Sequence, residues 1–297
     1  MLKSICKILL LGILFLVYSS LYAQHSAVFC GGTMYEPIKE NSIIIKESGF
    51  NTLIMWSMHI RENGALVYNG PVIIDDGQYV GVDYWPQEVK KLWEEPTSIN
   101  RIEFSIGAWG VPDFDNIQAL VEKEGTGPNS ILYKNFKVFK EVTGIDVINY
   151  DDETNYDVNS TVAFSKMLVD LGYKVTLCPY KNADFWKDVY TQVINYSPGA
   201  IDRIYLQCYA GGRRNDPGVW NEHFEGLTVI PGLWSKHGED CSKGYSPEEV
   251  RDKLAEWKKS AGISGGFMWL FNDILKCSGK TGVAEYAKVI NEVSGKK

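Results

Sequence analysis

Short apolar runs of strand length recur along the chain, and segments of helix length separate them. Runs of this kind, bounded by polar and Gly-containing stretches, are typical of buried strands. There are eight of them, and we predict a strand in each: residues 26–32, 51–58, 99–109, 145–153, 173–180, 202–210, 227–234 and 265–271.

The intervening segments carry helical patterns. Segment 161–172 repeats apolar residues at helical spacing and stops at Gly172. Segment 246–262 begins at Ser246 and has Glu249 three residues later, which is the arrangement of a capping box. Strands that alternate with helices pair in parallel through right-handed crossovers. The sequence therefore predicts an α/β fold.

Eight such repeats fit a closed (β/α)8 TIM barrel, which usually needs about 250 residues. An open, doubly wound sheet is the alternative, but only Gly31 and Gly32 follow the first strand, where a GxGxxG motif would stand. We find no linker, so residues 24–297 are assigned to one barrel domain. Residues 62–86 are expected to form a loop or hairpin inserted after the second strand, on the rim that holds a barrel's active site.

The chain begins with the features of an export leader. Lys3 and Lys7 precede or flank the apolar run 8–18, and small or polar residues follow to Ala23. The run is too short for a comfortable membrane span. We expect residues 1–23 to be a signal peptide and the mature protein to be periplasmic or secreted, with no membrane span.

The composition narrows the class of ligand. The formal charge is −7 and no cluster of Lys and Arg is present, which disfavours nucleic acid as a partner. The chain has 9 Trp and 17 Tyr, and flat amphipathic rings of this kind stack on neutral sugars as well as filling cores.

The cysteines are not spaced for a metal site, since no CxxC occurs. Three of them, Cys30, Cys178 and Cys208, stand in strand-like runs and are expected in the core. Cys241 and Cys277 stand in loop-like surroundings and could pair in an oxidising compartment.

Acidic residues cluster where the fourth predicted strand ends, in the sequence IDVINYDDE. Because strand side chains alternate, Asn149, Asp151 and Glu153 point together into the barrel. Two carboxylates this close in a poorly solvated place repel, so one of them tends to keep its proton at neutral pH. A protonated Glu at a barrel mouth can act as a general acid. For Asp152 we favour a role at the N-terminus of the following helix.

The octet 146–153 resembles the DGxDxDxE signature of glycoside hydrolase family 18, the chitinases and endo-β-N-acetylglucosaminidases. Three more segments resemble that family in order along the chain. SIGAWG at 105–110 is similar to its third-strand segment, LQCYA at 206–210 to its sixth and GGFMWLFND at 265–273 to its eighth.

The chain departs from that pattern at Val147, at Asn149 in place of the middle Asp, and at Ala108. Trp269 stands one position earlier than the eighth-strand Trp of the chitinase-like pattern. Either the strand is shifted there, or the floor of the sugar site is not Trp. The DDE sequence is closer to the endo-β-N-acetylglucosaminidase branch, which cuts between the two core GlcNAc units of N-glycans.

The resemblance implies a retaining reaction in which the substrate's own 2-acetamido group is the nucleophile, without metal or other cofactor. Glu153 would be the general acid and base, while Asp151 and Tyr209 would hold the acetamido group. The remaining substrate-binding candidates are Asn149, Gln207, Trp109, Trp234 and Trp269, although each Trp could equally fill packing at a strand end.

Active cleavage of N-glycans is the favoured function, with an oligosaccharide or glycoprotein glycan as the partner of a monomeric protein. The alternatives are a chitinase acting on chitin oligomers, a catalytically silent carbohydrate-binding barrel and an unrelated barrel enzyme. Retention of Asp151, Glu153 and Tyr209 favours an active enzyme, because a lectin does not need the acid.

Overall fold

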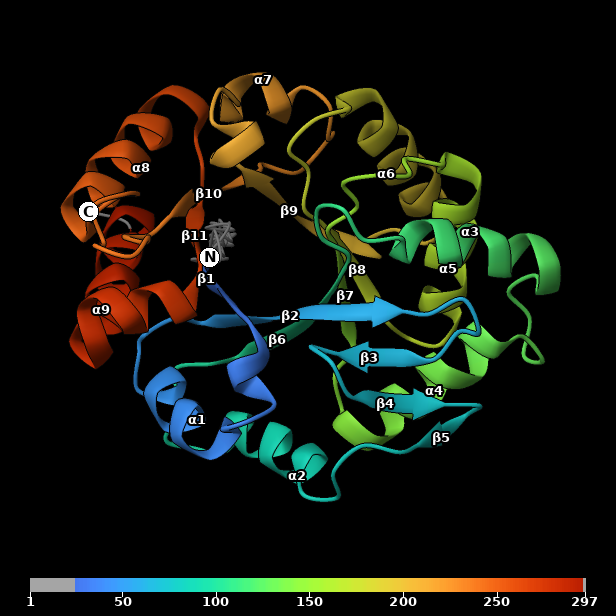
Figure 1. Ribbon diagram of the computed structural model, residues 1–297. Helices are drawn as coiled ribbons and strands as arrows, with labels where there is room; N and C mark the ends of the chain where they lie inside the picture. Colours follow the sequence, from blue (N-terminus) through green and yellow to red (C-terminus); the bar gives the residue numbers. More distant parts are fainter. Residues whose placement is uncertain (1–24, 296–297) are drawn as a thin grey trace, which may run out of the picture.

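Eight parallel strands close into a barrel in the computed structural model, which describes residues 25–295 (Figure 1). Neighbouring strands follow chain order, and β1 pairs with β2 on one side and β11 on the other, so no edge remains open. The barrel strands are β1 (His25–Cys30), β2 (Thr52–Ile60), β6 (Arg101–Ile106), β7 (Val147–Tyr150), β8 (Lys174–Leu177), β9 (Ile201–Gln207), β10 (Ile230–Trp234) and β11 (Gly265–Trp269). Each of the eight predicted strands is present and the (β/α)8 fold is confirmed. The predicted leader, residues 1–23, lies outside the described residues.

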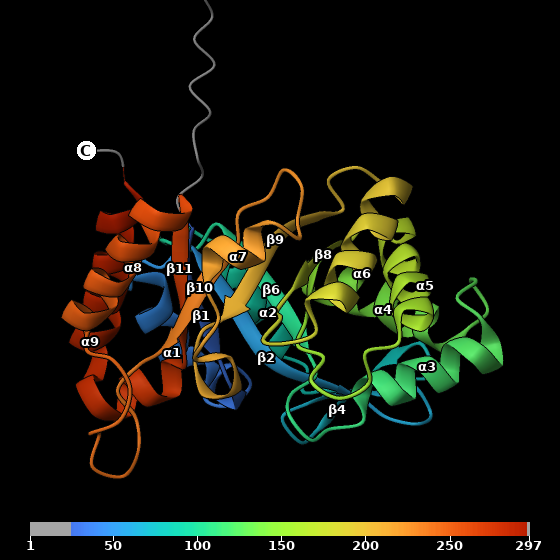
Figure 2. The ribbon, with the colours of Figure 1, turned by 90° about the horizontal axis from the view of Figure 1, so that it is seen from above.

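Helices surround the barrel on its outside, as two views at right angles show (Figures 1 and 2). They are α1 (Ile38–Lys46), α2 (Trp85–Lys90), α3 (Asp113–Glu124), α4 (Ile131–Thr143), α5 (Val158–Asp170), α6 (Ala183–Tyr196), α7 (Pro217–Asn221), α8 (Pro247–Ala261) and α9 (Phe271–Ser294). Three short 3-10 helices are η1 (Gly32–Met34), η2 (Lys91–Trp93) and η3 (Ala210–Gly212). No helix within residues 25–295 is long and apolar enough to cross a membrane.

The ends of the two predicted helices follow local sequence signals. In α8, Ser246 and Glu249 form the predicted capping box, and Gly262 ends the helix in the left-handed conformation. Helix α5 begins at Val158, where the Asp157 side chain accepts a hydrogen bond from the backbone N–H of Ser160. Helix α8 has the predicted ends, whereas α5 includes the predicted helical pattern but begins three residues before residue 161.

The segment inserted after β2 forms three antiparallel strands rather than a simple hairpin. These are β3 (Leu66–Tyr68), β4 (Val72–Asp75) and β5 (Gln78–Tyr79), which extend the sheet from the C-terminal end of β2. The buried Asn135 of α4 holds this extension, donating to the Gly64 carbonyl and accepting from the Gly77 N–H at 2.7 Å each. The extension follows the C-terminal end of β2, as expected, but no residue of it lines the pocket described below.

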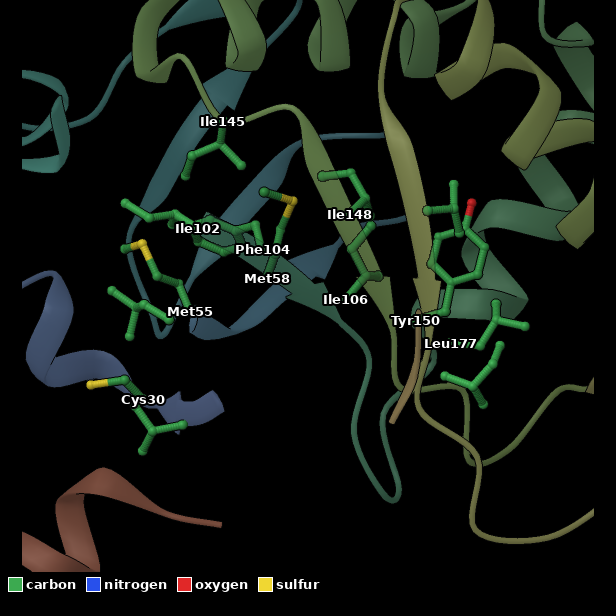
Figure 3. Packing of buried hydrophobic residues seen from close by; sticks show 14 of the residues in the cluster. Cys30, Met55, Met58, Ile102, Phe104, Ile106, Ile145, Ile148, Tyr150 and Leu177 are labelled. Carbon is green, nitrogen blue, oxygen red and sulfur yellow. The ribbon is translucent and has the colours of Figure 1, made fainter. Parts of the chain in front are cut away.

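Alternating side chains divide the apolar core into two layers. Outward-facing side chains such as Phe104 and Ile148 fill the layer between strands and helices (Figure 3). Inward-facing residues, among them Phe29 and Phe267, fill the barrel. Gly232 is required there, because a Cβ at this position would lie 2.0 Å from the Phe267 ring.

A buried carboxylate occupies the N-terminal end of the barrel and was not indicated by the sequence pattern. Glu103 is fully buried and accepts hydrogen bonds from Arg101 and Tyr205 at 2.7 Å and from Thr176 at 2.5 Å. Arg101 in turn makes a bidentate pair with Asp202 at 2.7 and 2.9 Å. Burial of Glu103 is tolerated because these donors satisfy its carboxylate.

The pairing and burial of the cysteines agree with the sequence surroundings of each one. Cys241 and Cys277 form a disulfide that ties the loop after β10 to α9, with Cα atoms 5.6 Å apart. Cys30, Cys178 and Cys208 are free and buried.

Candidate active site

A cavity of about 480 Å³ opens where the barrel strands end at their carboxyl termini. Because parallel strands all present their carboxyl ends at one face, residues far apart in the chain meet there. The lining residues are Trp56, Ala108, Trp109, Asp151, Glu153, Tyr180, Gln207, Tyr209, Ala210, Gly211, Trp234 and Trp269. The pocket thus brings together all of the sequence-derived candidates except Asn149.

Asp151 and Glu153 lie in this pocket and share one hydrogen-bond donor. Gln207 donates from Nε2 to Asp151 Oδ1 at 2.8 Å and to Glu153 Oε1 at 3.4 Å. The Asp151 N–H continues the strand pairing by donating to the Ile106 carbonyl at 2.8 Å. Gly107 permits this close approach, since its φ is +96° and a Cβ there would lie 2.5 Å from the Asp151 carbonyl oxygen.

Burial and mutual repulsion act on the two carboxyl groups. Burial first, and then the charge of Glu153, raise the pKa of Asp151 well above its usual range. Burial also raises the pKa of Glu153, against the opposing effect of the Gln207 hydrogen bond. A pair in this environment favours the state with one proton between two carboxyl groups at neutral pH.

Trp56 is a pocket residue that the sequence analysis missed. Its indole Nε1 donates to Asp151 Oδ2 at 3.3 Å. The available signal was its place near the end of the second apolar run, at an alternating position that faces into the barrel. An inward-facing Trp of this kind has the same sequence pattern as a Trp in the core. Only the folded barrel, which brings β2 and Asp151 together, distinguishes the two.

Aromatic rings form most of the remaining wall. Tyr209 stacks on Trp269 with ring centroids 5.9 Å apart and an interplanar angle of 23°, and Trp56 meets Trp269 edge-on at 4.8 Å. Trp109 is 80 % exposed at the rim. The indole Nε1 of Trp234 donates a hydrogen bond to Asp273 Oδ2 at 2.9 Å.

The position of Trp269 settles the alternatives left open by the sequence. Trp269 lies in the pocket despite standing one position early, because it shares the inward face of β11 with Phe267. The idea that a Trp is missing from the floor is therefore wrong.

Asn149 is placed differently from its expected role. It is fully buried beneath the pocket, where it accepts from Ser105 Oγ at 2.8 Å and donates to Thr176 Oγ1 at 2.9 Å. Direct contact with a substrate is incompatible with this burial. Its amide also bonds to these two hydroxyls rather than to Asp151.

Asp152 orders a loop and does not cap the following helix. Its carboxylate accepts from the backbone N–H groups of Thr154 and Asn155 at 3.0 Å and of Tyr156 at 2.9 Å. Helix α5 starts later, with Asp157 at its N-cap. Three backbone donors in a short loop compete successfully for the carboxylate.

The pocket is suited to acid–base chemistry on a ligand with apolar faces. Among residues 25–295, no group of three or more His, Cys, Asp and Glu is arranged for a metal ion. The carboxyl pair can exchange protons, and Gln207 and Tyr209 can hold a polar group of a ligand beside it.

Comparison with known proteins identifies structures of the same architecture. No family model matches the chain, and no curated protein does. A fungal endo-β-N-acetylglucosaminidase from glycosyl hydrolase family 18 superposes with a TM-score of 0.64 at 16% identity, covering 91% of this chain and 98% of that one.

Two further structures show the range of these neighbours. A GH18 chitinase from Pseudoalteromonas aurantia gives a TM-score of 0.62 at 13% identity, covering 91% of this chain and 99% of that chain. The spore cortex-lytic enzyme SleL from Bacillus megaterium QM B1551 gives 0.56 at 12% identity, covering 92% and 75%. The structural neighbours thus include GH18 chitinases and an endo-β-N-acetylglucosaminidase. At these identities the likeness shows that the chain has the GH18 glycoside hydrolase fold, and activity is a separate question.

Proposed function

We propose that the protein is a retaining glycoside hydrolase that cleaves β-1,4 linkages next to N-acetylglucosamine with assistance from the substrate. The observation that carries this proposal is the meeting of Asp151, Glu153, Gln207 and Tyr209 in one aromatic pocket at the carboxyl ends of the strands. Catalytic groups of a (β/α)8 enzyme lie at this face.

In the proposed reaction Glu153 protonates the glycosidic oxygen as the carbonyl oxygen of the 2-acetamido group attacks the anomeric carbon. Ionised Asp151 accepts a hydrogen bond from the acetamido N–H and stabilises the positive charge of the oxazolinium ring. The Tyr209 hydroxyl holds the carbonyl oxygen in line. Water then opens the ring, and Glu153 takes back the proton as base.

The environment of the carboxyl pair supports these roles. Glu153 is only partly buried and faces the pocket, so it can exchange protons with a leaving group or water. Asp151 is more deeply buried and held by donors, which suits a group that stays in place through the reaction. With one proton shared at neutral pH, the pair contains one acid and one anion. Burial and the charge of Glu153 favour the proton on Asp151 in the free protein, so the proposed reaction needs this proton to pass to Glu153 when substrate binds.

For the substrate we favour the core of N-glycans, as in an endo-β-N-acetylglucosaminidase. The DDE sequence supports this preference, as does the similarity to the fungal endo-β-N-acetylglucosaminidase. The second candidate is chitin oligomers, favoured by the aromatic rings of Trp109, Trp234 and Trp269 along the pocket. Stacking rings are what a linear chain of N-acetylglucosamine units binds.

We also propose that the protein acts after export. The leader-like sequence and the disulfide between Cys241 and Cys277 support this location, because disulfides persist in oxidising compartments. Mass spectrometry of the protein from its native cell fractions tests the proposal, and an intact N-terminal segment in the cytosolic fraction would refute it.

Incubation with a high-mannose glycoprotein and, separately, with chitin oligomers tests the substrate. Release of the glycan with one N-acetylglucosamine left on Asn supports the endo-glycosidase, whereas cleavage of chitin alone supports the second candidate. Matched glucoside and N-acetylglucosaminide substrates test assistance, and equal rates on both would exclude it.

Glu153→Gln tests the acid. Loss of a positioned general acid costs about 10²- to 10⁴-fold in rate, and the variant should still fold. Near-normal turnover by this variant would refute the assignment. Measurable binding by a wild-type protein that cleaves neither substrate would favour the carbohydrate-binding barrel.

A further inference from the structure

Asp151 is held at both carboxylate oxygens by neutral donors from opposite sides of the barrel. Trp56 on β2 donates to Oδ2 at 3.3 Å, and Gln207 on β9 donates to Oδ1 at 2.8 Å. Asn149, the inward neighbour on the same strand, gives its hydrogen bonds to Ser105 and Thr176 instead. The orientation of Asp151 therefore depends on Trp56 and Gln207.

We propose that Trp56 is a positioning residue, whose indole N–H fixes the orientation of the Asp151 carboxylate and favours its ionised form. This inference rests on the proposed function of the same pocket. A hydrogen bond to a carboxylate stabilises the charged form, so it biases which member of a coupled pair carries the proton.

The backbone at Trp56 is anchored by the strand extension. Asn69, in the turn between β3 and β4, donates from Nδ2 to the Trp56 carbonyl oxygen at 2.9 Å. Asn69 has a φ of +50° and packs against Gly32, where a Cβ would lie 3.0 Å from the Asn69 Cβ. The extension does not line the pocket, but through Asn69 it fixes one residue that does.

The next residues along β2 are anchored from the other side. Ser57 Oγ lies 3.0 Å from His59 Nε2, and His59 Nδ1 lies 2.8 Å from Asp113 Oδ2 at the start of α3. Ser57 and Asp113 are both buried. This chain of hydrogen bonds restrains the backbone that carries Trp56.

The Trp56 ring is also held by its neighbour. It meets Trp269 edge-on with ring centroids 4.8 Å apart and an interplanar angle of 78°. An indole held by a ring contact and by anchored backbone loses little further freedom when it donates to Asp151, so the hydrogen bond is preorganised.

Several ionisable groups face the carboxyl pair and set the background for any pH effect. Glu153 and Asp152 act on Asp151, and Lys181 lowers the pKa of Glu153 after the larger effects of burial and hydrogen bonding. Cys178 and Tyr209 are also close, and burial raises the pKa of each well above its usual range, so both stay neutral. The Trp56 hydrogen bond lowers the pKa of Asp151, against burial and the charge of Glu153.

The kinetic test is Trp56→Phe, which keeps an aromatic ring and removes the donor. Without the donor the pKa of Asp151 rises further, so the acid limb of the kcat profile moves to higher pH. A smaller fraction of the protein then has Asp151 ionised, so kcat falls roughly ten- to a hundredfold while KM changes little. An acid limb at the wild-type pH would overturn the inference.

The matched control is Trp234→Phe, since Trp234 lines the same pocket but donates to Asp273. It loses the same indole, and we expect a change in KM with the acid limb unmoved. If both variants move the acid limb equally, the effect belongs to loss of a pocket ring and the inference is wrong. Thermal unfolding of each variant establishes that it is folded.

A second measurement does not depend on hydrolysis. In ¹H–¹⁵N spectra of the tryptophan-labelled protein, the indole resonance absent from Trp56→Phe is that of Trp56. We expect this resonance to move with pH in the wild type and to stop moving in Asp151→Asn. A resonance that does not titrate in the wild type would refute the positioning role. Failure to cleave any sugar, with the titration present, would refute only the proposed function.

Discussion

The disulfide between Cys241 and Cys277 should stabilise the fold strongly, and replacing both cysteines by Ser tests this. The two residues are 36 positions apart. Cross-linking a loop of that length removes loop-closure entropy from the unfolded chain worth about 4 kcal/mol at 25 °C. For a domain of this size, a loss of that free energy lowers Tm by roughly 7 °C.

The disulfide also restrains a loop that contacts the edge of the pocket. The loop that it ties down carries His237, whose ring stacks on Trp234 at 4.0 Å and 15°. Tyr286 of α9 donates to the Tyr245 carbonyl at 2.6 Å and holds the far end of the loop. We therefore expect the double variant to raise KM while kcat changes less, because the carboxyl pair lies on other strands.

Thermal unfolding by circular dichroism, with and without a phosphine reductant, measures the effect. The reductant should lower Tm of the wild type to that of the double variant and leave the variant unchanged, so the variant is its own control. A wild type that unfolds at the same temperature in both conditions would refute the reasoning. So would a reductant effect of equal size in the variant.

Two further predictions concern buried carboxyl groups. Burial raises the folded-state pKa of Glu153, so its ionisation costs stability as pH rises from the unfolded value near 4 through the raised value. Glu153→Gln should therefore be more stable than the wild type at pH 7, by about 1.4 kcal/mol for each unit of that raise, and the gain should vanish near pH 3. Urea unfolding at both pH values checks the sign, and a less stable variant at pH 7 would contradict it. Glu103→Gln should cost about 3 to 5 kcal/mol, because it breaks the buried ion pair between Glu103 and Arg101 and leaves the Arg101 charge with Asp202 alone. Lys174→Ala removes an exposed partner of Asp202 from the same network and should cost less than about 1 kcal/mol, so equal losses in the two variants would refute the argument.

Much of the fold could be predicted because its signals are local. Each barrel strand is an apolar run. In helix α8, the capping box at Ser246 marks the start and Gly262 marks the end. The inward direction of Asp151 and Glu153 followed from strand alternation alone, since Ile148 and Tyr150 pack outward beneath the helices. Such features depend on residues that are neighbours in the chain.

The misplaced residues depend instead on partners from distant strands. Asn149 was expected to contact substrate, but its amide forms hydrogen bonds with the hydroxyl groups of Ser105 on β6 and Thr176 on β8, and its side chain is buried. Residues 62–86 were expected on the rim of the site, but Asn135 of α4 bonds to the extension, and no residue of it lines the pocket. Both results depend on contacts with residues distant in the sequence, so neither segment predicts its own placement.

The sequence by itself determined the order of the elements, the closed barrel and the acidic pair at the end of β7, because periodicity, capping and side-chain alternation act over a few residues. Only the tertiary structure decided that Gln207 bridges the pair and that Trp56 holds Asp151, since these residues stand 56 and 95 positions from Asp151. Closing the barrel brings the strands into register, and that register selects which side chains meet.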